Sequence, residues 1–289
     1  MIRRPVMRYH GGKWKLAPWI IQHFPEHRVY VEAFGGAGSV LMQKPRAYAE
    51  VINDLDGEIV NVFRVLRNPT TARELERIVR LTPFAREEFE LSYLADGDPV
   101  EQSRRTIFRT FAGFGSSAFN TERPTGFRHN TTRSGTTPAH DWADYPSQIA
   151  LFCERLRGVV VENRNAADVL LAHDAPTTLH YVDPPYVQST RQERQRRNYG
   201  DYEMTDDEHR ELAAVLHGLQ GMVVLSGYPC ALYDELYVDW HKEERGAFAD
   251  GAIARVEALW MSPNAVVQPT LMQRARVTAD APLFARVAE

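Results

Sequence analysis

Short apolar runs that alternate with helical patterns constrain the fold of this chain more than any other feature. Val29 to Phe34 is a strand-like run that ends in glycines, and Ala47 to Ile52 is a second run that ends in an Asn-Asp pair. Further short strands are expected at Val159 to Val161, Leu179 to Val182, Met222 to Leu225 and Ala258 to Met261. Strands that alternate with helices indicate a mostly parallel sheet with both faces covered. We therefore expect an α/β protein built on one doubly wound sheet.

Two helices between these runs have clear sequence signals. Apolar residues recur at helical spacing over 59–66, directly after the second run. Thr205 to Glu208 has the form of a capping box and precedes an apolar stripe that ends at Leu219. Both segments are therefore expected to pack an apolar face against the sheet.

The stretch from residue 83 to residue 159 has a different character. Helical patterns near 86–94 and 102–111 give way to a segment rich in glycine, serine, threonine, asparagine and proline. Over 113–140 no long apolar period is present, which is typical of turns or a hairpin. We expect one domain, residues 1–82 and 160–289, interrupted by an inserted domain over 83–159.

Composition excludes several classes of protein. The chain has 289 residues, of which 44% are hydrophobic and 25% charged, as in ordinary globular proteins. No apolar run is long enough to cross a bilayer, and none follows the basic N-terminus. Cys153 and Cys230 are far apart, which argues against a disulfide scaffold or a structural zinc site. We expect a cytoplasmic protein that contains no metal and does not contact a membrane.

Charge is unevenly distributed along the chain. The net charge is −4, but the stretch from Arg104 to Arg133 holds six arginines and one acidic residue. A second basic cluster, Arg191 to Arg197, holds four arginines and one acidic residue. Such patches on a mildly acidic body can bind a polyanion. The alternative is that both are solvated loops.

A glycine-rich turn follows the first strand. Phe34-Gly35-Gly36-Ala37-Gly38-Ser39 would let the backbone approach a ligand closely and direct amide groups at negative charge. Asp54 ends the next strand, where an acidic residue commonly holds ribose hydroxyls. Together they favour an adenosine-containing ligand, although a plain tight turn is an alternative. Neither a full dinucleotide fingerprint nor a phosphate-binding G-K-[ST] loop is present.

A second motif, Asp183-Pro184-Pro185-Tyr186, follows the strand at Leu179 to Val182. An aromatic amino group is a poor nucleophile because its lone pair is delocalised into the ring. A carboxylate from Asp183 and the carbonyl of Pro184 could accept its hydrogens and localise that lone pair. Tyr186 could stack on the base, which needs its ring but not its hydroxyl, so Tyr186→Phe is expected to be mild. A proline turn after a buried strand is the alternative.

Four motifs in order resemble one family. Tyr9-His10-Gly11-Gly12-Lys13, the glycine turn, Asn53-Asp54 and Asp183-Pro184-Pro185-Tyr186 look like the Dam-like, D12 class DNA adenine-N6 methyltransferases of the alpha group. The resemblance implies a Rossmann-like fold, S-adenosyl-L-methionine as methyl donor, and an insert that recognises the target in double-stranded DNA. It also implies that the target adenine is flipped out of the duplex for methylation at N6.

The resemblance assigns roles to particular residues. Asp54 would hold the cofactor ribose, Asn165 and Asp168 would contact its adenine, and Asp183 would touch both cofactor and target base. Other cofactor contacts are expected from Tyr9, Lys13, Phe34, Gly35, Gly36, Gly38 and Ser39. The catalytic motif consists of Asp183, Pro184, Pro185 and Tyr186. DNA contacts are expected from Arg8, Asn120, Arg123, Arg128 and Arg133.

The sequence departs from the family pattern at two places. Tyr9-His10 stands where Trp-Ala is frequent, and Glu32-Ala33-Phe34 lacks the usual central proline. Ser226-Gly227-Tyr228 ends a core strand and would either shape the base pocket or form a plain turn. Cytosine-N4 methylation and an inactive DNA-binding relative are the alternative functions. A restriction nuclease is a candidate partner, and the recognition sequence and oligomeric state do not follow from these residues.

Overall fold

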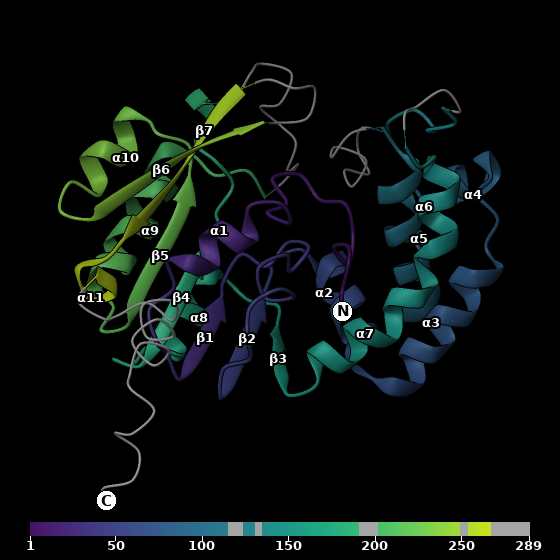
Figure 1. The fold of residues 1–289 in the computed structure, drawn as a ribbon, viewed down its shortest axis with the longest axis horizontal. Helices are drawn as coiled ribbons and strands as arrows, with labels where there is room; N and C mark the ends of the chain where they lie inside the picture. Colours follow the sequence, from purple (N-terminus) through teal and green to yellow (C-terminus); the bar gives the residue numbers. More distant parts are fainter. Residues whose placement is uncertain (115–123, 131–134, 191–201, 249–253, 267–289) are drawn as a thin grey trace, which may run out of the picture.

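The computed structural model describes residues 1–114, 124–130, 135–190, 202–248 and 254–266. Within these residues the strands form one seven-stranded sheet in the order β3-β2-β1-β4-β5-β7-β6 (Figure 1). The strands are β1 (Val29–Glu32), β2 (Ala49–Asn53), β3 (Val159–Glu162), β4 (Thr178–Val182), β5 (Met222–Gly227), β6 (His241–Phe248) and β7 (Ala254–Met261). The predicted α/β class is confirmed, and each predicted strand is present.

The sheet is parallel from β3 to β5 and antiparallel at its other end. β1 pairs with β2 and β4 in parallel, while β7 runs antiparallel to both β5 and β6. Strand β6 was not predicted, because its sequence HKEERGAF lacks an apolar run. The sheet is therefore mixed, with the chain order reversing between β1 and β4. In open α/β sheets ligands bind outside the carboxyl ends of the strands at such a reversal.

Helices cover both faces of the sheet, as the sequence predicts. On β5, Val224 points into one core cluster, whereas Val223 and Leu225 point into another. The first cluster includes residues of α1 (Ala17–Gln22) and α2 (Gly57–Arg67), and the second includes residues of α9 (Asp206–Gly218) and α10 (Ala231–Leu236). α8 (Ala166–Ala172) packs on the same side as α9, and α11 (Pro263–Val266) ends the described chain.

Five helices form a region beside the β3 edge of the sheet (Figure 1). We call this the helical region; it comprises α3 (Pro69–Leu81), α4 (Arg86–Leu91), α5 (Pro99–Ala112), α6 (Pro138–Asp144) and α7 (Pro146–Leu156). Four of these helices begin with proline, which fits the first helical position because its missing N–H needs no partner there. Asn68, Asp98 and Thr137 supply side-chain caps.

The helical region shares its core with the sheet. Phe108, Trp142 and Phe152 belong to the same buried cluster as Tyr30 of β1. Helix α3 packs against α5 and α7 although it precedes residue 83, where the insert was expected to begin. Within 113–140, Gly113 and Phe127 form an antiparallel bridge, and the segment ends in helix α6. In the part of the chain described, no helix is long and apolar enough to span a membrane.

Candidate active site

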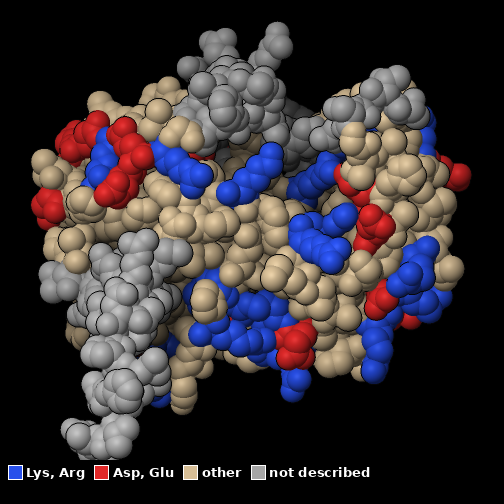
Figure 2. Space-filling view, viewed as in Figure 1, with Lys and Arg blue, Asp and Glu red and all other residues tan. Residues whose placement is uncertain are grey.

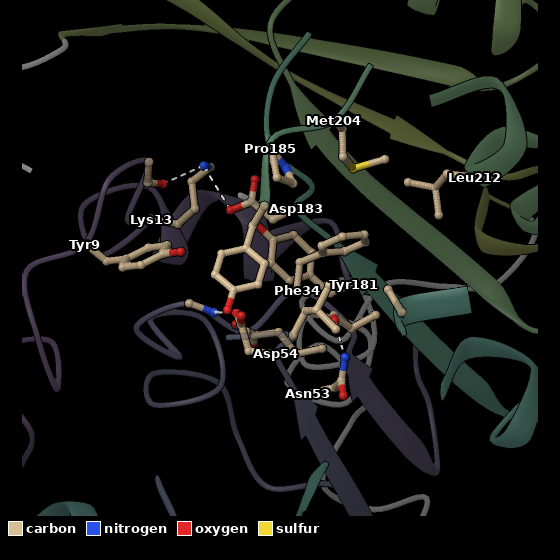
Figure 3. A pocket seen from close by; sticks show the side chains of 18 of the residues that line it. Tyr9, Lys13, Phe34, Asn53, Asp54, Tyr181, Asp183, Pro185, Met204 and Leu212 are labelled. Carbon is tan, nitrogen blue, oxygen red and sulfur yellow. Dashed lines mark hydrogen bonds and ion pairs between the residues drawn. The ribbon is translucent and has the colours of Figure 1, made fainter. Parts of the chain in front are cut away.

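A pocket of about 400 Å³ opens at the carboxyl ends of β1, β2 and β4 (Figure 3). Three stretches distant in sequence meet there: the N-terminal loop, the glycine turn after β1 and the residues after β4. The predicted site residues that line it are Tyr9, Lys13, Phe34, Gly35, Gly36, Ser39, Asp54, Asn165, Asp183 and Pro185. Most of the residues proposed from separate motifs are thus brought together in one cavity.

Glycine is required in the turn after β1 by both conformation and space. Gly36 has φ +47°, and a Cβ there would lie 3.0 Å from the ring of Tyr9. A Cβ on Gly35 would lie 2.7 Å from Ile52. Gly38, with φ +62°, faces Phe63 and does not line the pocket, so its part is to let the turn pack on α2.

Asp54 is held against this turn. One carboxylate oxygen accepts the N–H of Gly36 at 2.8 Å and the other accepts the N–H of Asp56 at 2.9 Å. Burial raises the pKa of Asp54 to about 6, although these backbone N–H groups act in the opposite direction. Each oxygen has a second lone pair that can accept a ligand hydroxyl.

Of the other predicted cofactor residues, two line the pocket and one does not. Ser39 lines the pocket, and its buried hydroxyl has no hydrogen-bond partner among the residues described. Asn165 lines it too and caps α8 by accepting the N–H of Ala167 at 2.9 Å. Asp168, in the first turn of α8, is exposed and does not line the pocket.

Lys13 and Asp183 form an ion pair inside the pocket. The Nζ of Lys13 lies 3.0 Å from Oδ2 of Asp183 and donates to the carbonyl of Gly11 at 2.6 Å. Burial alone would lower the pKa of the Lys13 ammonium, but Asp183 and Glu257 together raise it above its ordinary value. Ser226, a buried residue near the carboxyl end of β5, donates to Oδ1 of Asp183 at 2.7 Å and so is part of the site.

Tyr186 is anchored by a contact that the sequence did not predict. Its ring is buried, meets the ring of Tyr228 edge-on at 4.4 Å, and has the Nζ of Lys13 4.6 Å from its centre. Its hydroxyl donates to Oε2 of Glu257 at 2.8 Å. The expectation that this hydroxyl is dispensable overlooked the bond, because Glu257 lies 71 residues away. Pro184 is buried and does not line the pocket.

A second carboxyl group that sequence reasoning passed over lies at the floor of the pocket. Glu32, the last residue of β1, accepts the hydroxyl of Tyr30 at 2.8 Å and the N–H of Leu41 at 3.0 Å. Burial raises the pKa of Glu32 to about 8, although these two hydrogen bonds lower it. Glu32 therefore carries a proton for most of the time at neutral pH.

The wall opposite Tyr9 and Lys13 comes from α9 and the residues before it. Met204 and Leu212 lie on that side in Figure 3. The predicted capping box is confirmed, with Thr205 and Glu208 bonded reciprocally at the start of α9. Two residues of the apolar stripe of this helix, Leu212 and Val215, also line the pocket.

The basic stretch between Arg104 and Arg133 is only partly available to a ligand. Arg104 pairs with Glu88 and Glu101 at 2.7 Å, Arg105 pairs with Asp96 at 2.8 Å, and Arg109 pairs with Glu58 at 2.6 Å. All three arginines are buried. Half of the arginines counted as a basic patch are therefore neutralised by acidic partners, and that part of the expectation is wrong. Figure 2 shows acidic side chains beside basic ones over the helical region.

The predicted DNA contacts divide into two groups. Arg8 pairs with Asp141 at 2.9 Å and lies 5.2 Å from the centre of the Phe111 ring, which ties the N-terminal loop to the helical region. Arg128 is half-buried, and its backbone N–H donates to the carbonyl of Ala112. Asn120, Arg123, Arg133 and the cluster 191–197 lie outside the described residues.

Among the described residues no group of histidine, cysteine and acidic side chains could hold a metal ion. Cys153 and Cys230 are unpaired thiols, and burial raises the pKa of each. The described lining of the pocket offers carboxylates, the ammonium group of Lys13, the imidazole of His10, hydroxyls and aromatic rings.

Comparison with known proteins gives one informative match. A family model described as D12 class N6 adenine-specific DNA methyltransferase matches residues 9–248. No curated protein matches the chain. Among solved structures, a precorrin 8W decarboxylase from Methanobacterium thermoautotrophicum is 10% identical, with 86% of this chain and 89% of that chain covered and a TM-score of 0.33. A likeness at this level says nothing about what either protein binds.

Proposed function

This chain belongs to the D12 class N6 adenine-specific DNA methyltransferase family, and from that premise we propose how its pocket serves the reaction. The family uses S-adenosyl-L-methionine and acts on DNA. We propose that the cofactor occupies the pocket above β1 and β2, and that a flipped adenine enters beside Asp183. The observation that carries the proposal is the pair of contacts on Asp183, from Lys13 and Ser226, which fixes its carboxylate at the inner edge of the cavity.

The residues of the pocket fit this cofactor. Ser39 offers a buried hydroxyl with no partner among the described residues. Asp54 has lone pairs that can accept ribose hydroxyls, and the glycine turn packs so closely on Tyr9 and Ile52 that no Cβ would fit there. Met204, Leu212 and Phe34 supply apolar surface for a purine ring. When bound, S-adenosyl-L-methionine supplies an electrophilic methyl group, so the chain need not form a covalent intermediate.

The chain's own part is to orient the amino group. Asp183 accepts a hydrogen bond from N6, which concentrates the nitrogen lone pair toward the methyl group. Lys13 and Ser226 each bond one oxygen of Asp183, so the carboxylate cannot rotate freely. The carbonyl of Pro184 is proposed as the second acceptor and the ring of Tyr186 as the stacking surface.

Access to N6 requires the adenine to leave the duplex, because the atom is out of reach inside the base stack. We propose that the helical region holds double-stranded DNA while this occurs. Arg8 and Arg128, with Asn120, Arg123 and Arg133 outside the described residues, are the proposed contacts. Some would neutralise phosphates and others would read base edges in the major groove.

Radiolabelled methyl transfer tests the proposal. Purified protein, labelled S-adenosyl-L-methionine and mixed-sequence DNA lacking adenine methylation are incubated, and the DNA is digested to nucleosides. We expect the label in N6-methyl-2′-deoxyadenosine and none with Asp183→Asn. Label in N4-methylcytosine would favour the alternative base, and no label with the wild-type protein would favour an inactive DNA-binding relative. Modification-sensitive sequencing of the product gives the recognition sequence.

A further inference from the structure

Glu257 is a buried acidic residue in the apolar strand β7. Its neighbours Ala258, Leu259 and Trp260 are almost fully buried, and Glu257 itself is 9% exposed. Ala258 pairs with Gly227, the last residue of β5, so Glu257 lies level with the start of the loop that carries Tyr228. It therefore lies at the antiparallel end of the sheet, beside Tyr186 and outside the lining of the pocket.

A carboxylate in such a place must have polar partners to offset its loss of hydration. The hydroxyl of Tyr186 is one, at 2.8 Å from Oε2. The ammonium of Lys13 is near enough for Glu257 to raise its pKa. Tyr186 also meets Tyr228 edge-on, so its ring is held by a neighbouring ring at one side and by Glu257 at its far end.

The contact has a consequence for the reaction. A stacking ring must lie in one plane for the amino group to reach Asp183, and a small misplacement of a positioned group is costly in rate. If the ring of Tyr186 were free to tilt, it would stay buried and the protein would still bind the cofactor. The adenine stacked on that ring would, however, be poorly aligned with Asp183. The bond to Glu257 holds the hydroxyl through a charged acceptor and can therefore set this tilt.

We propose that Glu257 is a positioning residue that acts through the hydroxyl of Tyr186 and so fixes the ring against which the target adenine stacks. The inference rests on the proposed role of Tyr186 at the base. It assigns to strand β7 a part in the catalytic step. Glu257 touches neither the base nor the methyl group in this scheme.

A double-mutant cycle tests the inference. The rate constant kcat is measured for wild type, Glu257→Ala, Tyr186→Phe and the double variant, on mixed-sequence DNA lacking adenine methylation. Loss of a charge-assisted hydrogen bond predicts that each single variant falls by about tenfold or more. The double variant should fall no further than the worse single variant, because both remove one bond. Glu257→Gln should recover most of kcat, because its amide oxygen can still accept.

Two further measurements separate positioning from simple structural support. The Kd for S-adenosyl-L-methionine should change less than threefold in all variants, and thermal unfolding temperatures should not follow kcat. Glu244→Ala, which removes an exposed acid of the neighbouring strand β6, is the matched control and should keep wild-type kcat.

The results that overturn the inference are distinct from those that overturn the proposed function. Additive losses in the cycle, no recovery with Glu257→Gln, or losses of kcat that follow the unfolding temperature would each overturn the role of Glu257 while wild-type methylation stands. Failure of the wild-type protein to methylate adenine would overturn the proposed function and this inference with it.

Discussion

The pocket and helix α5 both concentrate charged side chains, but they use them in opposite ways. In the pocket, Asp54 and Asp183 are each fixed by two contacts and still face the cavity. In α5, Arg104 and Arg109 are buried, and acidic side chains from other helices neutralise them. The first arrangement keeps charge available to a ligand, and the second uses it to hold the fold together.

The difference shows which sequence signals can be trusted for function. The acids that neutralise α5 include Glu58 and Glu88, which lie outside the window over which the basic patch was counted. A local sum of charge therefore says little about the field outside the molecule. A motif at the end of a strand, in contrast, predicts where its residues lie in the fold. The reason is that the carboxyl ends of neighbouring parallel strands meet at one edge of the sheet.

The largest effect is expected in the pocket, from Asp183→Asn. The amide would place an N–H₂ group where an acceptor is needed and would lose the ion pair with Lys13. We expect kcat to fall by about a hundredfold or more, close to 2.7 kcal/mol, with the fold retained. Methyl transfer, cofactor affinity and thermal unfolding should be measured together. A variant with kcat within threefold of wild type would remove Asp183 from the reaction.

In α5 the expected loss is of stability. Arg109→Ala removes a buried guanidinium and leaves Glu58 unpaired. Breaking a buried pair costs about 3–5 kcal/mol, and we expect about 2 because the Glu58 side chain is 33% exposed. Denaturant unfolding measures this. Arg77→Ala, at an exposed pair on α3, is the control and should change stability by less than about 0.5 kcal/mol. Equal losses of stability for Arg109→Ala and Arg77→Ala would show that the buried pair of α5 stabilises the fold no more than an exposed pair does.

The role proposed for Asp54 makes the affinity of the pocket for the cofactor depend on pH. We propose that the ionised form of Asp54 accepts the ribose hydroxyls, and burial raises its pKa to about 6. Cofactor affinity should therefore reach its full value about one pH unit above 6 and, below pH 6, fall toward a limit of about tenfold per unit, or about 1.4 kcal/mol. Titration calorimetry between pH 5 and pH 8 measures the effect. Asp54→Asn should bind more weakly and without this dependence, and a flat wild-type profile would contradict the role.

The smallest effect is expected for Arg128, on the segment that follows α5, if its role is to contact a phosphate. If it contacts a phosphate, Arg128→Ala should weaken binding to every DNA sequence alike and reduce the salt-dependence slope by about one unit. If it reads a base, discrimination at one position should relax, at a cost of about 1–3 kcal/mol. DNA binding at several salt concentrations distinguishes the two, with Arg77→Ala as the control. No change in either quantity would place Arg128 with the arginines that serve only the fold.

Local patterns predicted much of the fold and of the candidate site. The strands β1 to β5 and β7, the capped helix α9 and the pocket positions of Lys13, Asp54 and Asp183 all follow from contiguous motifs. Strand β6 could not be predicted, because its HKEERGAF sequence has no apolar run and it is held by pairing with β7. Glu257, Glu58 and Glu88 were missed for a related reason: each acts across the fold, and spacing along the chain carries no trace of it.

The late position of β7 bears on how the protein is made. This strand lies between β5 and β6, so β6 has no strand neighbour among the described residues until residues 254–261 have left the ribosome. Until then the nascent chain exposes the edge of β5, an open template for pairing with other chains. A premature stop after β6 would leave every sequence motif of the active site intact and still yield a polypeptide prone to aggregate. Quality control of synthesis, more than loss of any catalytic group, would then decide the fate of such a truncated product.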